Sequence, residues 1–468
     1  MNESDKLMHE REGDMKRKPD TLTPDVLKRK GVMKGFEYLT PERREGVREM
    51  ENKFRAVVES FGFKEIEGPI LQPIEFYQVK SGEELLTHTY TFEDADGSLL
   101  VLRPELTPTV AYMIARDDAT LSFPLRWWSN PDLFRKEKPQ KGRKRQFKQL
   151  NVDIFDRADS GRERPFDDAE IIAVAISIFE SFGLTENDIV MRINSRSLVE
   201  RLFDMMNLEK NQRSNLLSLI DKTGKISDED FDHKLEEIVP QGSSQELLRK
   251  WLSINKLSEI AEDDQLRPLS ESTEYGDLAK VFELMNAYGL SGYCEFSPYI
   301  VRGLGYYTGT VFEAFDRKPE YGFRRALMGG GRYDNLTKDM GGRLDITGVG
   351  FGFGNVPLEE ILISRNIEIG SSRPQIDYFI VIQSSDQRMD ALKIARRLRK
   401  QGKQVVLDDS IAKEKPDKVS KQLSRANEAN SKYSLLIFPE EWETGKIVIK
   451  DMQSGEQQTT DIDSLLES

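Results

Sequence analysis

The strongest constraint on this fold is a run of basic residues enclosed by two apolar segments. Between Arg135 and Lys148 the chain has eight Lys or Arg residues and one acid, Glu137, although its 468 residues carry a formal net charge of −13. Apolar residues flank the run at 125–128 and 150–155, and a proline and a glycine in its interior favour a turn. The pattern predicts two antiparallel strands joined by a long basic loop.

A basic loop of this kind suits a polyphosphate ligand, because guanidinium groups form paired hydrogen bonds with phosphate oxygens. A charged segment that only faces water is the plainer alternative. Gln146, Phe147 and Gln149 alternate with the cations, so the segment also offers amide and aromatic contacts. These residues favour a binding surface over a purely solvated segment.

The composition is that of a soluble, globular chain, with 38% hydrophobic and 32% charged residues. Its length predicts about two to four domains. No apolar run approaches the roughly 18 residues of a membrane-spanning helix. Residues 1–30 have the features of neither a signal peptide nor a transit peptide, and we expect them to form a frayed N-terminal tail. A cytoplasmic protein without membrane contact is therefore expected.

Scarce residue types exclude several kinds of site. Cys294 is the only cysteine, so neither a disulfide framework nor a cysteine zinc site is expected. The three histidines, His9, His88 and His233, are scattered, which argues against a multi-histidine metal site or a Ser-His-Asp site. The sequence also lacks a P-loop motif. Phosphate chemistry in this chain must therefore use arginines, carboxylates and Mg²⁺.

The N-terminal half reads as a mixture of strands and helices. A helix is predicted from Thr40 to Phe61, with strands at 63–66, 69–71, 90–92 and 99–102. Glu105 and Thr107 follow the last of these strands, at a corner before a helix over 109–116. Such a corner places side chains either toward a ligand or onto the helix terminus as caps, and both alternatives stay open. A third helix is predicted over 169–182, capped by Asp167 or Asp168 just before it.

The remaining chain can be divided into segments by their hydrophobic spacing and composition. Residues 196–275 have helical spacing without strand signals and are interpreted as a helical insertion between two parts of a core, 31–195 and 276–365. Strands are predicted at 293–296 and 299–302, followed by glycine clusters at 303–309, 329–331 and 348–354, where a ligand or backbone approaches closely. Beyond a linker at 365–374, alternating strands and helices predict a small α/β domain over 374–468, with a final hairpin around Gly445.

Several motifs resemble those of class II aminoacyl-tRNA synthetases, and specifically the histidyl-tRNA synthetase family, with archaeal-type members the most similar. The resemblance covers residues 32–455. Residues 62–69 resemble motif 1, which forms the dimer interface in the family, and Phe134–Glu137 with the loop 141–147 resembles motif 2. Residues 301–309 and 330–334 resemble the two histidine-specific signatures. These signatures are highly specific, because other class II enzymes lack them.

The resemblance implies a fold and an activity. The fold is an α+β class II core, an antiparallel sheet flanked by helices, with a helical insertion and a C-terminal α/β anticodon-binding domain. The activity is that of a homodimeric histidine–tRNA ligase, which activates histidine with ATP and Mg²⁺ and transfers it to tRNA(His). The alternative is a catalytically silent paralogue, acting as the regulatory subunit of ATP phosphoribosyltransferase or as a histidine or tRNA sensor.

The resemblance also implies roles for individual residues around ATP. Arg135 is expected to bind the α-phosphate and the histidine carboxylate, and Arg302 to stabilise the pentavalent phosphorus; these are the expected catalytic residues. Glu137 is expected at the adenine amino group, Phe147 on the adenine ring and Arg143 at the terminal phosphates.

Further residues are implied around histidine. Glu105 and Thr107 are expected to take the α-amino group and Gln149 the carboxylate. Asp153 stands where the family often has Glu and is a candidate for hydrogen bonding to the substrate. Three tyrosines are expected to line the imidazole pocket: Tyr306, Tyr307 and Tyr333.

One departure from the family pattern concerns motif 3, which in most class II enzymes ends in an acid–arginine pair that reaches ATP. Here the pair is replaced by Val356 and Pro357. The expectation is that binding of the γ-phosphate passes to Arg143, Arg145 or another arginine that the sequence does not identify.

Overall fold

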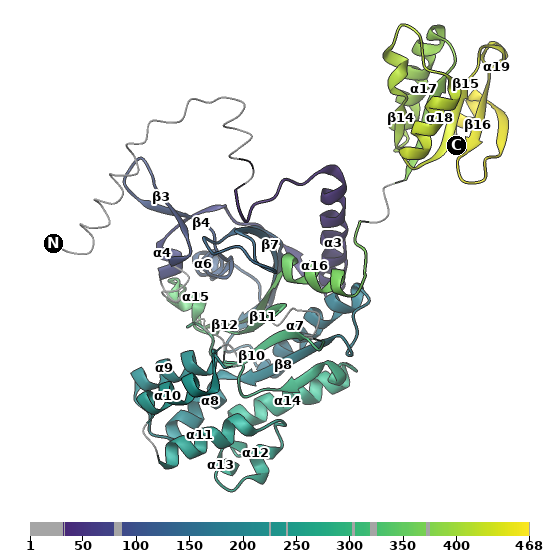
Figure 1. Cartoon of the computed structure of the whole chain (residues 1–468). Coiled ribbons are helices and arrows are strands. Elements are labelled where there is room, and N and C mark those ends of the chain that lie inside the picture. The colour runs from purple at the N-terminus through teal and green to yellow at the C-terminus, as the bar shows by residue number, and fades with distance from the viewer. Residues whose placement is uncertain are drawn as a thin grey trace. The chain divides into compact units, whose positions relative to one another are not determined.

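The computed structural model describes residues 31, 33–78, 87–223, 226–239, 242–301, 305–318, 325–370 and 375–467. The chain separates into two compact units, one built on Glu49–Glu368 and the other on Ile369–Ser468 together with Thr40–Arg48 (Figure 1).

The centre of the first unit is a large sheet. Within the described residues it has nine strands in the order β1-β5-β7-β12-β11-β10-β8-β9, with β6 paired to β7. Only the outer pairs β1–β5 and β8–β9 are parallel. Their bounds are β1 Lys64–Glu65, β5 Leu125–Ser129, β6 Asp132–Phe134, β7 Gln146–Arg157, β8 Ile189–Ser195, β9 Cys294–Phe296, β10 Thr310–Asp316, β11 Met328–Arg332 and β12 Ile346–Gly354. The expected antiparallel core, with a basic loop before β7, is confirmed.

Helices bury their apolar faces around this sheet. α3 (Pro41–Ser60) begins where the Thr-Pro pair predicts and ends just before Gly62, whose φ of 80° suits glycine. Its Phe54 contacts the rings of Phe182 and Phe353, the latter on β12. α7 (Arg164–Ser181) packs against β7 and β12 and is buried along most of its length.

A smaller sheet, in the order β2-β4-β3, leads into the corner before α6 (Thr107–Asp117). Its strands are β2 Leu71–Pro73, β3 Tyr90–Glu93 and β4 Leu99–Leu102, close to the predicted segments. The short helix α4 (Glu75–Gln78) packs against α6. Together these elements support one wall of the cavity described below.

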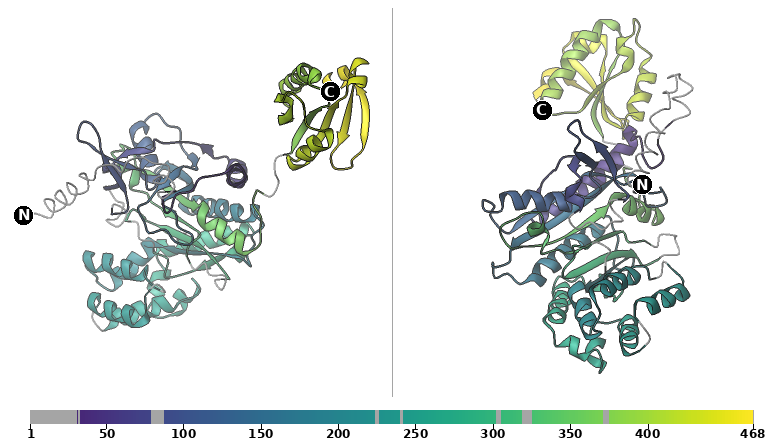
Figure 2. Two further views of the ribbon diagram at one scale, coloured as in Figure 1. Left: turned by 45° about the horizontal axis from the view of Figure 1, so that its top comes forward. Right: turned by 90° about the vertical axis from the view of Figure 1, so that its left-hand side faces the viewer.

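The described residues between 196 and 287 form helices joined by short connections, as the helical spacing in the sequence predicts. The helices are α8 Arg196–Met205, α9 Lys210–Ile220, α10 Asp228–Ile238, α11 Ser243–Ser253, α12 Glu259–Glu262, α13 Arg267–Ser270 and α14 Thr273–Ala287. They gather beside the β8–β9 edge of the large sheet, which α8 and α14 contact (Figures 1 and 2).

Two expectations in the first unit are wrong. Asp167 and Asp168 do not cap the helix: α7 begins earlier, at Arg164, because Pro165 suits its first turn, and both aspartates are buried inside it. The segment 299–301 is not a strand but a turn and irregular chain. Pro298, just before it, has no N–H to donate to a neighbouring strand, so the sheet ends at β9.

The second unit is a five-stranded sheet in the order β14-β13-β15-β16-β17, with helices that follow the predicted α/β alternation. Its elements are β13 Ile376–Ile382, α17 Arg388–Lys400, β14 Val405–Leu407, α18 Val419–Glu428, β15 Ser431–Ile437, α19 Pro439–Glu443, β16 Lys446–Asp451, β17 Gln457–Asp461 and α20 Ile462–Glu467. The final hairpin does not lie around Gly445, as expected, but at residues 452–456, where Gly455 has a φ of 80° and its N–H binds the Asp451 carbonyl.

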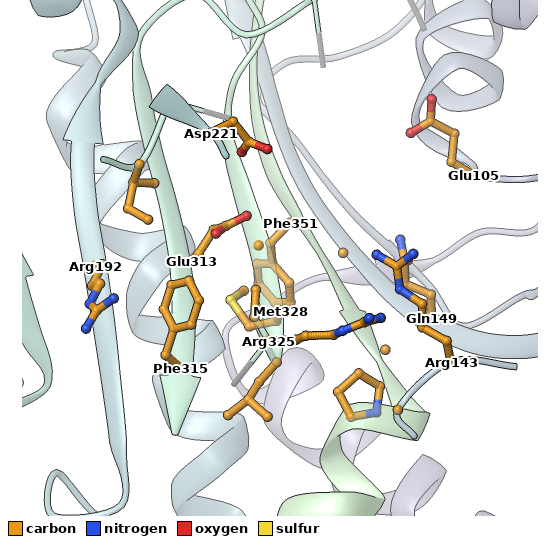
Figure 3. A pocket seen from close by; sticks show the side chains of 18 of the residues that line it. Glu105, Arg143, Gln149, Arg192, Asp221, Glu313, Phe315, Arg325, Met328 and Phe351 are labelled. Carbon is orange, nitrogen blue, oxygen red and sulfur yellow. The ribbon is translucent and has the colours of Figure 1, made fainter. Parts of the chain in front are cut away.

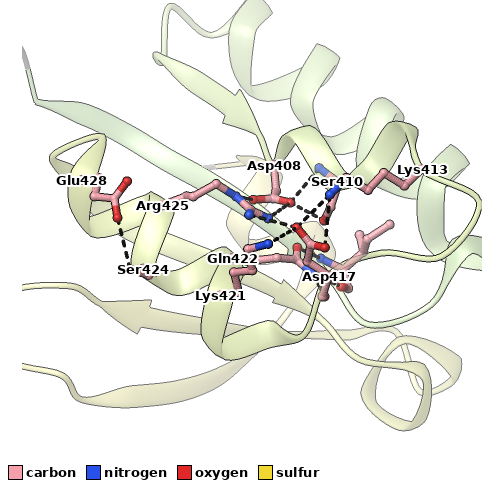
Figure 4. A network of polar contacts seen from close by, with 10 residues as sticks. Asp408, Ser410, Lys413, Asp417, Lys421, Gln422, Ser424, Arg425 and Glu428 are labelled. Atoms are coloured by element: carbon pink, nitrogen blue, oxygen red, sulfur yellow. Dashed lines mark hydrogen bonds and ion pairs between the residues drawn. The ribbon is translucent and has the colours of Figure 1, made fainter.

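Charged side chains hold α18 of this unit in place (Figure 4). The guanidinium of Arg425 donates to both carboxylate oxygens of the buried Asp408, at 2.6 and 2.7 Å, and to Asp417 at 2.9 Å. Among the described residues of the whole chain, no helix is both long and apolar enough to cross a membrane.

Candidate active site

A cavity of about 1230 Å³ lies in the first unit, against the glycine-rich strands β11 and β12 (Figure 3). Its walls are formed by the corner before α6, the β6–β7 loop, strands β7 and β10, and the chain just before β11. Ten residues predicted for the site line it: Glu105, Thr107, Arg135, Glu137, Arg143, Phe147, Gln149, Tyr306, Tyr307 and Tyr333.

Two predicted residues stand apart from this set. Arg302 lies outside the residues that the structure describes. Asp153 does not line the cavity but lies directly behind it, because the hydroxyl of Tyr333 donates a hydrogen bond to its carboxylate.

The β6–β7 loop is a compact turn whose cations have defined partners. Arg143 and Gln140 form an isolated antiparallel bridge, and the guanidinium of Arg143 pairs with the carboxylate of Glu137. Arg145 does not line the cavity: its Nε donates to the Glu137 carbonyl at 3.0 Å. Of the two named candidates for the terminal phosphates, Arg143 therefore faces the cavity and Arg145 stabilises the loop.

Arg135 is a partly buried cation at the base of this loop. Its Nε donates to the Pro104 carbonyl at 2.9 Å, and its guanidinium carbon lies 5.2 Å from the centre of the Phe147 ring. Burial lowers the pKa of Arg135, while the neighbouring Glu105 and Glu137 carboxylates oppose this shift. A guanidinium nevertheless stays protonated in proteins, so the cavity presents a desolvated positive charge to an anionic ligand.

Glu105 belongs to the cavity rather than to a helix cap. The residue before α6 is Leu106, and no side chain caps this helix. Instead, the Glu105 carboxylate accepts a hydrogen bond from the Tyr306 hydroxyl at 3.2 Å, and its carbonyl accepts one from Tyr77 at 3.1 Å. Thr107, the first residue of α6, lines the same wall. Of the two alternatives from sequence, the structure shows no side-chain cap on α6 and places this carboxylate and hydroxyl at the cavity wall.

Three tyrosines form an aromatic cluster next to this carboxylate. The ring centres of Tyr306 and Tyr307 are 4.9 Å apart, and that of Tyr333 lies 5.9 and 6.5 Å from them. All three side chains are buried, although they line the cavity. The cluster makes a pocket that is apolar in its walls and polar at its hydroxyl groups.

Burial raises the pKa of Asp153 to about 7, although the hydrogen bond from Tyr333 opposes the shift. The glycines of β12 make room for this arrangement. Gly350 pairs with Asp153 across the β7–β12 ladder, and a Cβ atom on Gly350 would lie 2.6 Å from the Tyr333 hydroxyl. Gly352 leaves similar space for the amide of Gln149, which donates to Asn151 at 2.8 Å. The clustered glycines therefore mark close approach of backbone, as the sequence pattern predicts, and also of side chains, which it does not predict.

Sequence reasoning missed a buried ion-pair network behind the cavity. Arg332 donates to Asp168 at 2.8 Å, to Asp334 at 3.0 Å and to the Arg164 carbonyl at 3.0 Å, and Thr310 donates to Asp168 at 2.6 Å. Burial favours the neutral guanidine, but the two carboxylates outweigh it and raise the pKa of Arg332. The network joins β10 and β11 to α7, which holds the glycine-rich strands in place.

Several cavity residues were also missed: Arg192, Asp221, Glu313, Phe315 and Arg325. Figure 3 shows Glu313 directing its carboxylate into the cavity, with Asp221 nearby and Arg192 at one side. The alternation along β10 could have revealed Glu313 and Phe315, which are two residues apart and share a face. No sequence signal identifies Asp221, because it reaches the cavity from the helical insertion.

Comparisons with known proteins agree with this geometry. Residues 35–355 match the family model described as histidyl-tRNA synthetase, and residues 377–468 match an anticodon binding domain. The chain is 33% identical over 422 residues to the histidine–tRNA ligase of Opitutus terrae, covering 89% of this chain and 93% of that protein. It is 32% identical over 430 residues to that of Haloarcula marismortui, covering 91% and 94%.

Solved structures are similar as well. A histidyl-tRNA synthetase from Nostoc sp. PCC 7120 superposes with a TM-score of 0.74 at 26% sequence identity, covering 93% of this chain and 98% of that one.

Proposed function

The chain belongs to the histidyl-tRNA synthetase family, and we propose that it is a histidine–tRNA ligase that forms histidyl-adenylate in the cavity described above. One observation carries this proposal: a single cavity combines the partly buried Arg135 and arginines of the surrounding loops with a carboxylate–tyrosine pocket. The silent paralogue is not favoured, because the chain has an anticodon-binding domain and ten of the predicted site residues share the cavity.

The carboxylate–tyrosine end is the proposed histidine site. Glu105, held by Tyr306, is placed to bind the α-ammonium group, and Thr107 lies beside it. The imidazole fits among the tyrosines, where Asp153 and Tyr333 form a linked pair of hydrogen-bonding groups. An amino acid without an imidazole leaves such buried groups unpaired, which is a strong source of discrimination. Gln149 is proposed to orient the carboxylate.

The arginine end is the proposed ATP site. Arg135 is placed for the α-phosphate, and Phe147, which already stacks with Arg135, for the adenine ring. Glu137 and Arg143 are paired with one another in the structure. Binding of ATP exchanges this pair for contacts of Glu137 with the adenine amino group and of Arg143 with the terminal phosphates.

The proposed reaction has two steps. An oxygen of the histidine carboxylate attacks the α-phosphorus of ATP, the bond to the β-phosphate oxygen breaks, and pyrophosphate leaves. A terminal hydroxyl of tRNA(His) then attacks the histidyl carbonyl and AMP leaves. The first step needs alignment and neutralisation of charge more than a protein base, which suits a cavity rich in arginines. Arg302 is proposed to stabilise the phosphorus in this step, and Arg302→Ala is expected to abolish adenylate formation.

Mg²⁺ is proposed to enter with ATP. The described residues contain no group of three or more His, Cys, Asp or Glu side chains that could hold a metal ion by themselves. Mg²⁺ commonly needs no such group, because substrate phosphates and one or two carboxylates hold it. Glu313 and Asp221 place carboxylates at the cavity for this purpose (Figure 3). The ion neutralises charge on the phosphates.

A homodimer in the cytoplasm is also proposed. Motif 1 leads into the small β2-β4-β3 sheet, which exposes Ile70, Leu71, Phe92 and Leu99 to between 44% and 49% of their surface. Apolar side chains exposed together on one sheet favour contact with a second copy. Sedimentation of the purified chain tests this proposal: a monomer at micromolar concentration contradicts it.

Histidine-dependent exchange of pyrophosphate into ATP tests the activity. Exchange with histidine but with none of the other amino acids, followed by charging of tRNA(His), is the expected result. A folded protein that binds histidine yet catalyses no exchange would instead support the regulatory paralogue.

A further inference from the structure

At one end of the cavity, the position at which class II motif 3 supplies an arginine is occupied by an apolar residue. Val356 and Pro357, at the start of α16 (Asn355–Ser364), line the cavity in place of the acid–arginine pair. Neither side chain can donate a hydrogen bond to a phosphate. If ATP binds here, another residue must contact its terminal phosphates on this side.

Arg325 lies at the same end of the cavity. In the antiparallel ladder of β11 and β12, Met328 is paired with Phe353. The chain leaves this pair in both directions: Arg325 lies three residues before Met328, and Val356 lies three residues after Phe353, in the first turn of α16. Arg325, Val356 and Pro357 all line the cavity. The chain just before β11, the neighbour of β12, therefore brings an arginine to the cavity that the two motif 3 residues also line.

The guanidinium of Arg325 points across the cavity toward Arg143 (Figure 3). Partial burial and the charge of Arg143 lower the pKa of Arg325, and Glu137 opposes this. Among the described residues, Arg325 forms neither a hydrogen bond nor an ion pair that would account for its position. Two guanidinium groups that face one another repel, and a polyanion bound between them removes this repulsion.

We propose that Arg325 binds the terminal phosphates of ATP from the wall opposite Arg143, and that it replaces the motif 3 arginine that this chain lacks. The inference rests on the proposed function of the cavity. Contacts from both sides hold the pyrophosphate group in line with the attacking carboxylate and neutralise its charge as it leaves. Arg325 is thus a binding and positioning residue for the leaving group.

Calorimetric binding of ATP and of AMP, which lacks the terminal phosphates, tests the inference without requiring turnover. Arg325→Ala is expected to weaken ATP binding at least about tenfold, the worth of a charge-assisted hydrogen bond, and to leave AMP binding unchanged. The ATP affinity of Arg325→Lys is expected to lie between those of the unchanged chain and Arg325→Ala, because lysine retains the charge but not the planar fork. Arg116→Ala, which removes an exposed arginine on α6, is the matched control.

Moving the arginine tests the replacement directly. In the Arg325→Ala background, Pro357→Arg is expected to restore a preference for ATP over AMP. Unchanged ATP affinity in Arg325→Ala, or an equal loss for ATP and AMP, overturns the inference. If the double variant binds ATP as weakly as Arg325→Ala alone, an arginine at position 357 does not replace one at position 325, and the proposed equivalence of the two positions is overturned. A wild-type chain that prefers ATP through Arg325 but exchanges no pyrophosphate with histidine refutes the proposed function and leaves this inference standing.

Discussion

The phenol of Tyr333 donates a hydrogen bond to the carboxylate of Asp153, and Gly350 on the intervening strand β12 leaves the space in which the two meet. Asp153 lies on β7 and Tyr333 directly follows β11, so the contact spans three neighbouring strands. It places a carboxyl group with a pKa of about 7 behind the proposed imidazole pocket.

Gly350→Ala is expected to separate this pair. The added methyl group would lie 2.6 Å from the Tyr333 hydroxyl and closer still to the Asp153 carboxylate, so one of them has to move. We expect the KM for histidine to rise at least about tenfold and stability to fall by about 1–3 kcal/mol. Gly276→Ala is the control: this glycine lies within α14 with open space around it, and alanine there should be neutral or stabilising. Equal histidine KM values for both variants would contradict the role of Gly350.

Asp153 is expected to make stability depend on pH near neutrality. Its folded pKa, about 7, is above the ordinary value near 4, so the folded state keeps a proton that the unfolded state loses. The free energy of unfolding therefore falls as pH rises from about 4 to about 7, and levels off above that. Asp153→Asn should remove this part of the slope. Denaturation at several pH values measures it, and parallel curves for both proteins would contradict the assignment.

Tyr306→Phe is expected to weaken histidine binding selectively. The substitution removes the hydroxyl that donates to Glu105 at 3.2 Å and keeps the ring in the aromatic cluster. A hydrogen bond to a charged group contributes about 1.5–3 kcal/mol, so the KM for histidine should rise by about 10-fold or more while the KM for ATP is retained. Exchange kinetics provide both constants. Tyr288→Phe, at an exposed position after α14, is the control; a rise in the ATP KM alone would argue against the proposed histidine site.

Arg425→Ala is expected to destabilise the second unit. Asp408 is 1% exposed and would lose both of its hydrogen bonds from the guanidinium. Removing one partner of a buried ion pair costs about 3–5 kcal/mol, and because Arg425 is itself partly exposed we expect a value near the lower end. Arg396→Ala on the exposed face of α17 should change stability by less than about 0.5 kcal/mol. Similar melting curves for the two variants would show that the network contributes little.

The same network makes the stability of the second unit depend on pH, and the direction of that dependence can be stated. Although burial opposes ionisation, the Arg425 and Ser410 hydrogen bonds lower the pKa of Asp408 below its ordinary value. Its contribution is therefore present above pH of about 4 and is lost as pH falls through the lower, folded pKa. Acid unfolding of the second unit should begin at higher pH in Arg425→Ala than in the unchanged chain.

Much of this protein could be predicted locally. The strands around the basic loop, the corner at Glu105 and the alternation of the C-terminal domain follow from patterns within short stretches of chain. The cap predicted at Asp167 or Asp168 is wrong because α7 begins earlier, and the Asp168 carboxylate instead accepts a hydrogen bond from Arg332 on a distant strand. No local pattern reveals such a partner.

Patterns in the sequence were enough to predict the antiparallel core, the helical insertion, the C-terminal α/β domain and ten residues that line the cavity, because hydrophobic periodicity, turn residues and family motifs are properties of adjacent positions. The folded structure was needed to choose between the open alternatives. It places Glu105 against Tyr306, Arg143 at the cavity, Arg145 on the loop backbone, and Arg325 in the same cavity as Val356. The positions of Glu105 and Arg325 relative to their neighbours depend on contacts between segments far apart in the chain, and these are set only when the sheet buries its faces.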